Sequence, residues 1–284
     1  MKQVIIIICI IIILLLIIKH YKSSLNWETK IVCYIHDYIY LKEYIDSIFP
    51  NNEVIIYNKS DAYFTGNYNY ISIRRIPYIN SSPNPPIYIK DEKKPNNIVF
   101  NSLPYFSNEC KVGFLNTEHN TDHVNLNYNK MYINNSIDYY DYSLSNINIF
   151  GRGTYLPYKN NPNEINKLIN FINKPKKFDV CLVGTKSERR NIIVEQIKCN
   201  NITIDYIQGF GGERDERIGR CKILLNIHMY DNWKVYEEIR CERWRFAGMT
   251  IISEKCIDIL PEGIIECTLD NVIEKIKTTL YNII

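Results

Sequence analysis

The sequence predicts an α/β protein with two Rossmann-like domains, a cleft between them, and a transmembrane helix at the N-terminus. Short apolar runs alternate with helix-length amphipathic segments along most of the 284 residues. Runs such as Phe178–Val183 are apolar nearly throughout, which is typical of parallel strands buried on both faces. Near the N-terminus, Val4–Ile18 is an unbroken run of apolar residues.

We expect this N-terminal run to be a single-pass membrane anchor. As a helix, residues 4–18 span roughly 22 Å, and the flanking Lys2, Lys19 and Lys22 could reach lipid head groups. A secretory signal peptide is one alternative, but no small residues mark a cleavage site after the run. A helix buried in the fold is another, which the charged flanks disfavour. Residues 1–22 are therefore interpreted as an uncleaved anchor in an ER/Golgi-like membrane, in either orientation.

The charge balance argues against a nucleic-acid partner. The formal net charge is +3, and the three lysines beside the apolar run account for it. The remaining chain has as many acidic as basic residues, so binding through the phosphate backbone of a nucleic acid is not expected. Nine cysteines without a C-x-x-C pair predict mostly reduced thiols in the core rather than a zinc site.

Residues 23–158 are expected to form the first domain. The elements expected in it are strands at Lys30–His36, Glu53–Tyr57, Asn97–Phe100, Lys111–Leu115 and Ile137–Tyr140, helices at Tyr38–Phe49, near Asp122–Met131 and from Ser143 onward, and a last extended piece at Tyr155–Tyr158. The proline- and asparagine-rich stretch Pro77–Pro95 is expected to lack regular structure.

A linker over residues 159–177, with an amphipathic segment at Glu164–Ile172, is expected to lead into a second domain over residues 178–284. The elements expected there are strands at Phe178–Val183, Ile202–Ile207, Ile223–His228 and Met249–Ser253, and helices at Ser187–Lys198, Glu213–Arg220, Trp233–Phe246 and Leu269–Tyr281.

The turns after these strands are the first candidates for a site, because open parallel sheets bind ligands at the carboxyl ends of their strands. Gly184 opens one turn, and Arg189 and Arg190 follow at the start of a helix; backbone amides and guanidinium groups suit a diphosphate. An exposed basic helix start explains the same residues. Gly211 permits close approach of a ligand, and His228 ends a strand, but an ordinary turn and a structural histidine are equally good interpretations.

The segment Val235–Gly248 is the most informative one. On a helix, Glu238, Glu242 and Arg245 share one face. A solvated face laced with salt bridges is the ordinary explanation. Alternatively, a carboxylate near the helix start could accept hydrogen bonds from ribose hydroxyls, and an arginine could bind phosphate.

The region around this segment resembles the donor-binding half of glycosyltransferases with the GT-B fold. It is most similar to glycosyltransferase-like proteins of large DNA viruses and to bacterial spore-coat-type glycosyltransferases. The resemblance is carried by Asn226-Ile227-His228, Glu238-x-Arg240-x-Glu242, Ala247-Gly248 and Ser253-Glu254. It reaches back to about Lys111 but is specific only after Phe178. The Glu-x7-Glu spacing of many retaining enzymes is missing, so neither the stereochemical outcome nor the ribose-binding carboxylate follows from it.

The resemblance implies transfer of a sugar from a nucleotide-sugar donor to a glycan, protein or lipid acceptor. The N-terminal anchor places this activity in an ER/Golgi-like or virus-associated membrane, as an expectation. The donor-binding residues it implies, together with the placement of residues at strand ends, are Gly184, Arg189, Arg190, Gly211, His228, Glu238, Arg240 and Glu242. A catalytically inactive GT-B-like structural or sugar-binding protein is the alternative. A different nucleotide-dependent enzyme is a weaker one, since the glycine-rich dinucleotide fingerprint is absent.

On the acceptor side, Glu118 and His119 follow the strand at Lys111–Leu115 and could take up the proton of an acceptor hydroxyl. Asp122 and His123 lie just beyond, so a metal site is conceivable, but its ligands would crowd on a short turn. No D-x-D motif occurs. We therefore expect neither a metal nor a cofactor.

Overall fold

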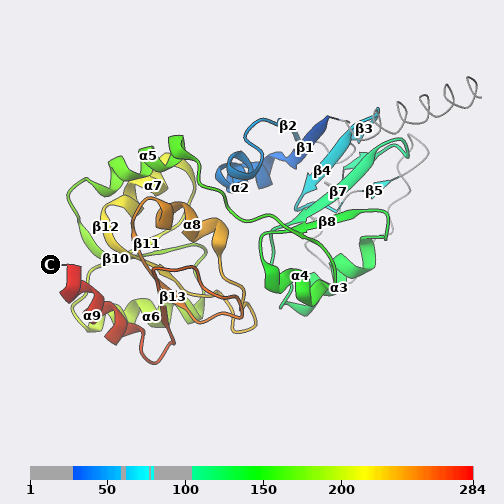
Figure 1. Cartoon of the computed structure of the whole chain (residues 1–284). Coiled ribbons are helices and arrows are strands. Elements are labelled where there is room, and N and C mark those ends of the chain that lie inside the picture. The colour runs from blue at the N-terminus through cyan, green and yellow to red at the C-terminus, as the bar shows by residue number, and fades with distance from the viewer. Residues whose placement is uncertain (1–27, 59–61, 77, 80–103, 284) are drawn as a thin grey trace, which may run out of the picture.

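The computed structural model describes residues 28–58, 62–76, 78–79 and 104–283. This part of the chain forms two lobes, each built on a parallel sheet with helices on its faces (Figure 1). The apolar run at 4–18, the strand expected at Asn97–Phe100 and most of Pro77–Pro95 lie outside the described residues. None of the helices within the described ranges is long and apolar enough to cross a membrane.

The first lobe contains a six-stranded parallel sheet in the order β2-β1-β4-β7-β8-β9. Its strands are β1 (Thr29–Tyr34), β2 (Glu53–Tyr57), β4 (Asn69–Ile73), β7 (Lys111–Asn116), β8 (Asp138–Asp141) and β9 (Thr154–Tyr155). Its helices are α2 (Ile35–Ile48), α3 (His123–Tyr132) and α4 (Leu144–Phe150). A small parallel sheet has the order β3-β6-β5, with β3 (Tyr63–Phe64), β5 (Tyr78–Ile79) and β6 (Tyr105–Phe106).

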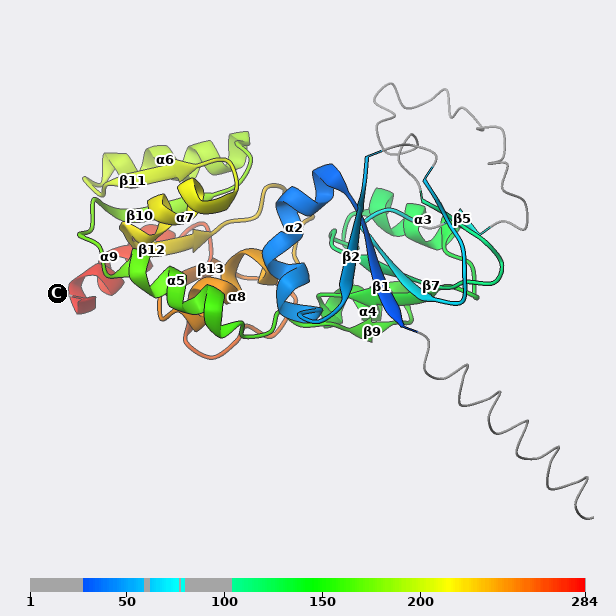
Figure 2. The ribbon, with the colours of Figure 1, turned by 90° about the horizontal axis from the view of Figure 1, so that it is seen from above.

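Helix α2 is one of the elements of this lobe that face the second lobe, as Figures 1 and 2 both show. Its buried residues Leu41, Tyr44 and Ile45 pack on one face of the sheet, against a cluster that includes Ile31 and Ile73. This leaves the opposite side of α2 available to the space between the lobes.

The second lobe contains a five-stranded parallel sheet in the order β11-β10-β12-β13-β14. Its strands are β10 (Phe178–Val183), β11 (Ile204–Ile207), β12 (Cys221–Asn226), β13 (Thr250–Glu254) and β14 (Ile264–Cys267). Its helices are α5 (Pro162–Ile172), α6 (Glu188–Cys199), α7 (Gly211–Gly219), α8 (Glu238–Phe246) and α9 (Val272–Ile283).

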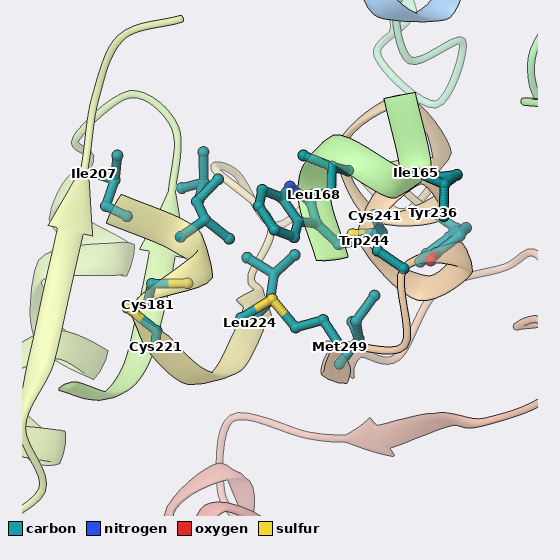
Figure 3. Packing of buried hydrophobic residues seen from close by; sticks show 14 residues of the cluster. Ile165, Leu168, Cys181, Ile207, Cys221, Leu224, Tyr236, Cys241, Trp244 and Met249 are labelled. Atoms are coloured by element: carbon teal, nitrogen blue, oxygen red, sulfur yellow. The ribbon is translucent and has the colours of Figure 1, made fainter. Parts of the chain in front are cut away.

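Helices cover both faces of this second sheet, so its central strands are apolar on both sides. Helices α5, α7 and α8 lie on one face, where Trp244 and Leu168 pack against Leu224 (Figure 3). Helices α6 and α9 lie on the other face, where Ile193 and Ile276 belong to a separate cluster. The mixed α/β class with parallel sheets is thus confirmed and is consistent with a Rossmann-like fold.

Three details differ from the sequence-based expectations. The interval 159–177 contains helix α5, which packs so closely on α7 that a Cβ on Gly219 would lie 2.5 Å from the Cβ of Phe171. The helix expected from Trp233 begins only at Glu238, because the preceding residues dock against the first lobe. Strands β4 and β14 and the two-residue strands β3, β5 and β6 were not predicted, although β4 is central to the first sheet.

Candidate functional site

In both sheets the carboxyl ends of the strands point to the same cleft. In each, the order of strands reverses beside the first strand, between β1 and β4 and between β10 and β12, and ligands of such sheets bind outside the strand ends at this point. A cleft of about 620 Å³ lies between the lobes at these ends. It is lined by residues that follow β4, β7, β10 and β11 and by residues of α2, α7 and α8. The cleft is the candidate site.

Two arginines cross the end of β10 on the wall of the second lobe. Gly184 follows β10 with a φ of +128°, and a Cβ at this position would lie 2.8 Å from Nη1 of Arg190 and 3.4 Å from Nη2 of Arg240. A side chain here would therefore meet both guanidinium groups. The glycine therefore makes room for two neighbouring guanidinium groups at the end of β10.

Both guanidinium groups are held in place by acceptors from β12 and the residue after it. Arg190 is buried and donates to the carbonyl of Ile227 from Nε at 2.9 Å and from Nη2 at 2.7 Å. Arg240 donates from Nη1 to Oδ1 of Asn226 at 3.0 Å. Burial, together with the charge on Arg240, lowers the pKa of Arg190 to about 10, so Arg190 is still cationic at neutral pH.

The opposite wall is a short loop after β7 that side-chain amides hold rigid. Nδ2 of Asn116 and Nδ2 of Asn146 each donate to the carbonyl of Glu118 at 2.8 Å. The buried Asp141 accepts from Asn116 at 2.7 Å and from Asn146 at 3.0 Å. These bonds fix Glu118 and His119 at the cleft.

Glu118 forms an ion pair with Arg74, whose Nη2 lies 2.5 Å from its Oε1. Arg74 directly follows β4 and has a φ of 61°. Burial raises the pKa of Glu118, and the charge of Arg74 opposes this effect.

His119 connects the two lobes. Its Nε2 lies 2.8 Å from Oε1 of Glu237, and its ring stacks on Trp233 with a centroid separation of 4.8 Å and an interplanar angle of 18°. Only 2% of His119 is exposed, and within the described residues its Nδ1 has no hydrogen-bond partner. Burial alone would raise the pKa of Glu237, but Arg240 and His119 hold that pKa well below its usual range. Glu237 is therefore a carboxylate, and Nε2 of His119 donates to it.

The structure brings half of the sequence-predicted site residues together. Those that line the cleft are Glu118, His119, Gly184, Arg190 and Arg240. Those that are not among its lining residues are Arg189, Gly211, His228, Glu238 and Glu242.

Arg189 and His228 take part in contacts at the ends of β12 and β13. Arg189 pairs with Glu254 and with Asp231, and it donates to the carbonyl of His228 at 3.0 Å. Nε2 of His228 lies 3.3 Å from the carbonyl of Lys255, and burial lowers the pKa of His228.

The two carboxylates expected to bind ribose are occupied by the protein itself. Glu238 accepts from the hydroxyl of Tyr155 at 2.9 Å and from the backbone amide of Tyr158, which joins α8 to the first lobe. Glu242 accepts from Nη2 of Arg245 at 2.6 Å and from the hydroxyl of Tyr236 at 3.1 Å.

Sequence reasoning missed Arg74, Trp233 and Glu237. Glu237 precedes α8 and lies in its N-cap position, so it is aimed differently from the helical Glu238. No local signal marked the later start, because Asp231 and Asn232 stand directly before Trp233 and are good N-cap residues for a helix that begins there.

Contacts between the lobes close the rim of the cleft beside α2. The rings of Tyr40 and Phe210 meet edge to face at 4.2 Å. Nη2 of Arg214 lies 3.1 Å from Oε1 of Glu43. Within the described residues, no group of three or more His, Cys, Asp or Glu side chains is placed to hold a metal ion.

Comparison with known proteins places the chain beside uncharacterised viral proteins. It is 38% identical over 175 residues to uncharacterized protein L138 of Acanthamoeba polyphaga mimivirus, covering 58% of this chain and 20% of that protein. It is 35% identical over 179 residues to uncharacterized protein L137 of the same virus, covering 59% of this chain and 24% of that protein. It is 36% identical over 154 residues to uncharacterized protein L140 of that virus, covering 50% of this chain and 51% of that protein.

The chain thus spans between a fifth and about half of the length of these relatives. No protein-family profile matches the chain, and no solved structure matches it.

Proposed function

We propose that the protein is a glycosyltransferase of the GT-B type, which transfers a sugar from a nucleotide-sugar donor to a glycan, protein or lipid acceptor. One observation carries the proposal. The carboxyl ends of two parallel sheets meet at a single cleft, where Arg190 and Arg240 cross Gly184 on one wall and Glu118 and His119 lie on the other.

The second lobe supplies what a diphosphate requires. Two adjacent guanidinium groups offer planar, charged donors, and the missing side chain of Gly184 makes room for them beside the backbone. Glu237 is the carboxylate nearest to Arg240, at 3.7 Å. A donor diphosphate would relieve the repulsion between the two arginines and stabilise the leaving group.

The first lobe supplies groups for the acceptor. Glu118 or His119 would take up the proton of the acceptor hydroxyl, and closure of the lobes would exclude water from the transfer. The anchor over residues 4–18 remains part of this proposal and would hold the cleft near a membrane.

The experiment is a thermal-shift screen of the full chain in detergent against UDP, GDP, ADP and dTDP and against UDP-glucose, GDP-mannose, ADP-glucose and dTDP-glucose. We expect at least one nucleotide to raise the melting temperature. In calorimetry, Arg240→Ala should lower the affinity for that nucleotide by about 10- to 100-fold, because it removes one charged hydrogen-bonding group.

Arg217→Ala is the matched control, because Arg217 is 41% exposed and pairs with Asp205 outside the cleft. It should leave nucleotide affinity unchanged. If no nucleotide of the panel stabilises the chain, or if Arg240→Ala binds as well as the wild type, the proposal is wrong.

A non-catalytic sugar-binding protein is the second candidate. The ion pair between Glu118 and Arg74 favours it, because both charges of that wall are already satisfied. A nucleotide sugar that binds but never releases its nucleoside diphosphate would support this candidate.

A further inference from the structure

We propose that His119 is the base of this reaction through Nδ1, and that Glu237 and Trp233 are its positioning residues. The inference rests on the proposed function and chooses between its two candidate bases. The base stands on one lobe and its positioning residues on the other, so the working arrangement exists only when the lobes are together.

Glu237 determines which nitrogen of His119 carries the proton. Because Glu237 is ionised, it can only accept, and Nε2 of His119 at 2.8 Å must donate to it. In the neutral imidazole this places the free lone pair on Nδ1. The stack on Trp233 fixes the plane of the ring, so the lone pair has a defined direction.

Two polar atoms of the same loop lack partners. Within the described residues, Nδ1 of His119 and Oγ1 of Thr117 are buried without a hydrogen bond, and both residues line the cleft. A buried polar atom without a hydrogen-bond partner destabilises the folded state. A hydroxyl can both donate and accept, so an acceptor hydroxyl is the kind of group that either atom lacks.

The charges favour His119 over Glu118 as the base. Proton uptake by His119 creates an imidazolium directly beside the carboxylate of Glu237, which is a new ion pair. Proton uptake by Glu118 removes the negative charge that Arg74 contacts at 2.5 Å, so an existing ion pair is lost. The site therefore stabilises protonated His119 but does not stabilise protonated Glu118.

The transfer step forms one bond, breaks one bond and moves one proton. The acceptor oxygen forms a bond to the anomeric carbon of the sugar while the bond from that carbon to the donor phosphate breaks. The electron pair of the broken bond leaves with the nucleoside diphosphate. The hydroxyl proton passes to Nδ1, and the resulting imidazolium keeps its Nε2 hydrogen bond to Glu237.

The first test is the tautomer of His119, which needs no substrate. The full chain in detergent is labelled with ¹⁵N-histidine, and the signal of His119 is assigned by its loss in His119→Gln. We expect the tautomer protonated at Nε2 in the wild type. In Glu237→Gln the amide can donate to Nε2, so the signal should move toward the form protonated at Nδ1.

The second test is the release of nucleoside diphosphate from the four nucleotide sugars of the panel, with water as acceptor. Glu237→Gln should lower kcat by about 10²- to 10⁴-fold with little change in KM, because an acid-to-amide change behind a catalytic histidine disfavours the working tautomer. Trp233→Phe, which can still stack, should retain more activity than Trp233→Leu. Glu216→Gln on the exposed side of α7 is the matched control and should behave as the wild type.

A wild-type His119 protonated at Nδ1 overturns the inference, as does wild-type turnover in Glu237→Gln. A larger loss in Glu118→Gln than in His119→Gln also overturns it. If the wild type releases no diphosphate from any member of the panel, the proposed function fails and the role of base fails with it. The first three outcomes leave the proposed function intact.

Discussion

Gly184 lacks a side chain where two guanidinium groups cross the end of β10. Its φ of +128° is a conformation that other residues adopt only under strain. A residue at this position must therefore adopt a positive φ, and it must also leave room for the guanidinium groups of Arg190 and Arg240.

Replacing this glycine separates the two requirements. Gly184→Ala should cost about 1–3 kcal/mol of stability through backbone strain and should weaken nucleotide binding at least about 10-fold by displacing the arginines. Gly263→Ala is the control, since Gly263 has a φ of +87° and an added Cβ would meet nothing within 4 Å. It should share the loss of melting temperature but keep the affinity measured by calorimetry. Equal affinities of both variants would contradict the prediction.

Glu238 offers a test by pH. Burial raises the pKa of Glu238 from 4.5 to about 7, so the folded chain binds more protons than the unfolded chain between these values. Its contribution to stability is complete below about pH 4.5 and is lost as the pH rises through about 7. The free energy of unfolding of the wild type, relative to Glu238→Gln, should fall by about 1–3 kcal/mol from about pH 5 to about pH 8 in urea titrations. A difference that stays constant with pH would contradict this.

At the scale of elements, four helices converge on Arg243. Its guanidinium lies 2.8 Å from Asp215 of α7, 2.6 Å from Glu164 of α5 and 3.7 Å from Glu43 of α2, and its side chain is 4% exposed. This cluster ties α8 to its own lobe and to the first one.

Removing the cation should be costly because it leaves buried carboxylates without their partner. Arg243→Met should lose about 3–5 kcal/mol of unfolding free energy. Arg217→Met, which breaks a more exposed pair, should lose about 1 kcal/mol or less. Urea unfolding followed by tryptophan fluorescence measures both. Losses of similar size would show that the cluster around Arg243 contributes no more than a surface pair.

The start of α8 decides which carboxylate reaches the cleft. A helix from Trp233, as the sequence alone suggested, would place Glu237, Glu238 and Glu242 by helical spacing. In the structure Glu237 precedes the helix and contacts His119, while Glu238 turns to the hydroxyl of Tyr155. Spacing within one segment cannot predict this, because the contacts come from the other lobe.

At the scale of the whole molecule, the segment before α8 docks the lobes together. Val235 is fully buried in the cluster of the first lobe, together with Leu115 and Tyr142. Nearby, Asp258 accepts from Oγ of Ser143 and from the backbone amide of Tyr236, both at 2.8 Å.

This docking should make the two lobes unfold as one unit. Calorimetry of the wild type should show a single transition, and Val235→Ser should separate it into two by placing a hydroxyl in the apolar cluster. Val235→Ile, which keeps the site apolar, should retain a single transition. Two transitions in the wild type would show that the lobes are energetically independent.

Local sequence patterns predict the α/β class and the positions that follow the parallel strands. Apolar runs such as β10 and β12 identify strands buried on both faces, and Gly184 and His228 follow their ends within two residues. Arg190 and His119 were selected by the same local reasoning, since each lies within a few residues of a strand end. Local patterns suffice here because strand burial and turn chemistry depend on neighbouring residues.

Which of these residues share a cleft depends on contacts between segments that lie far apart in the sequence. Arg74 and Trp233 reach Glu118 and His119 from elsewhere in the sequence, and Glu237 is distinguished from Glu238 by a contact across the lobes. The physical reason is that a side chain is directed by the partner that satisfies it. For His119 and Glu237 that partner lies 118 residues away in the chain, where no local pattern records it.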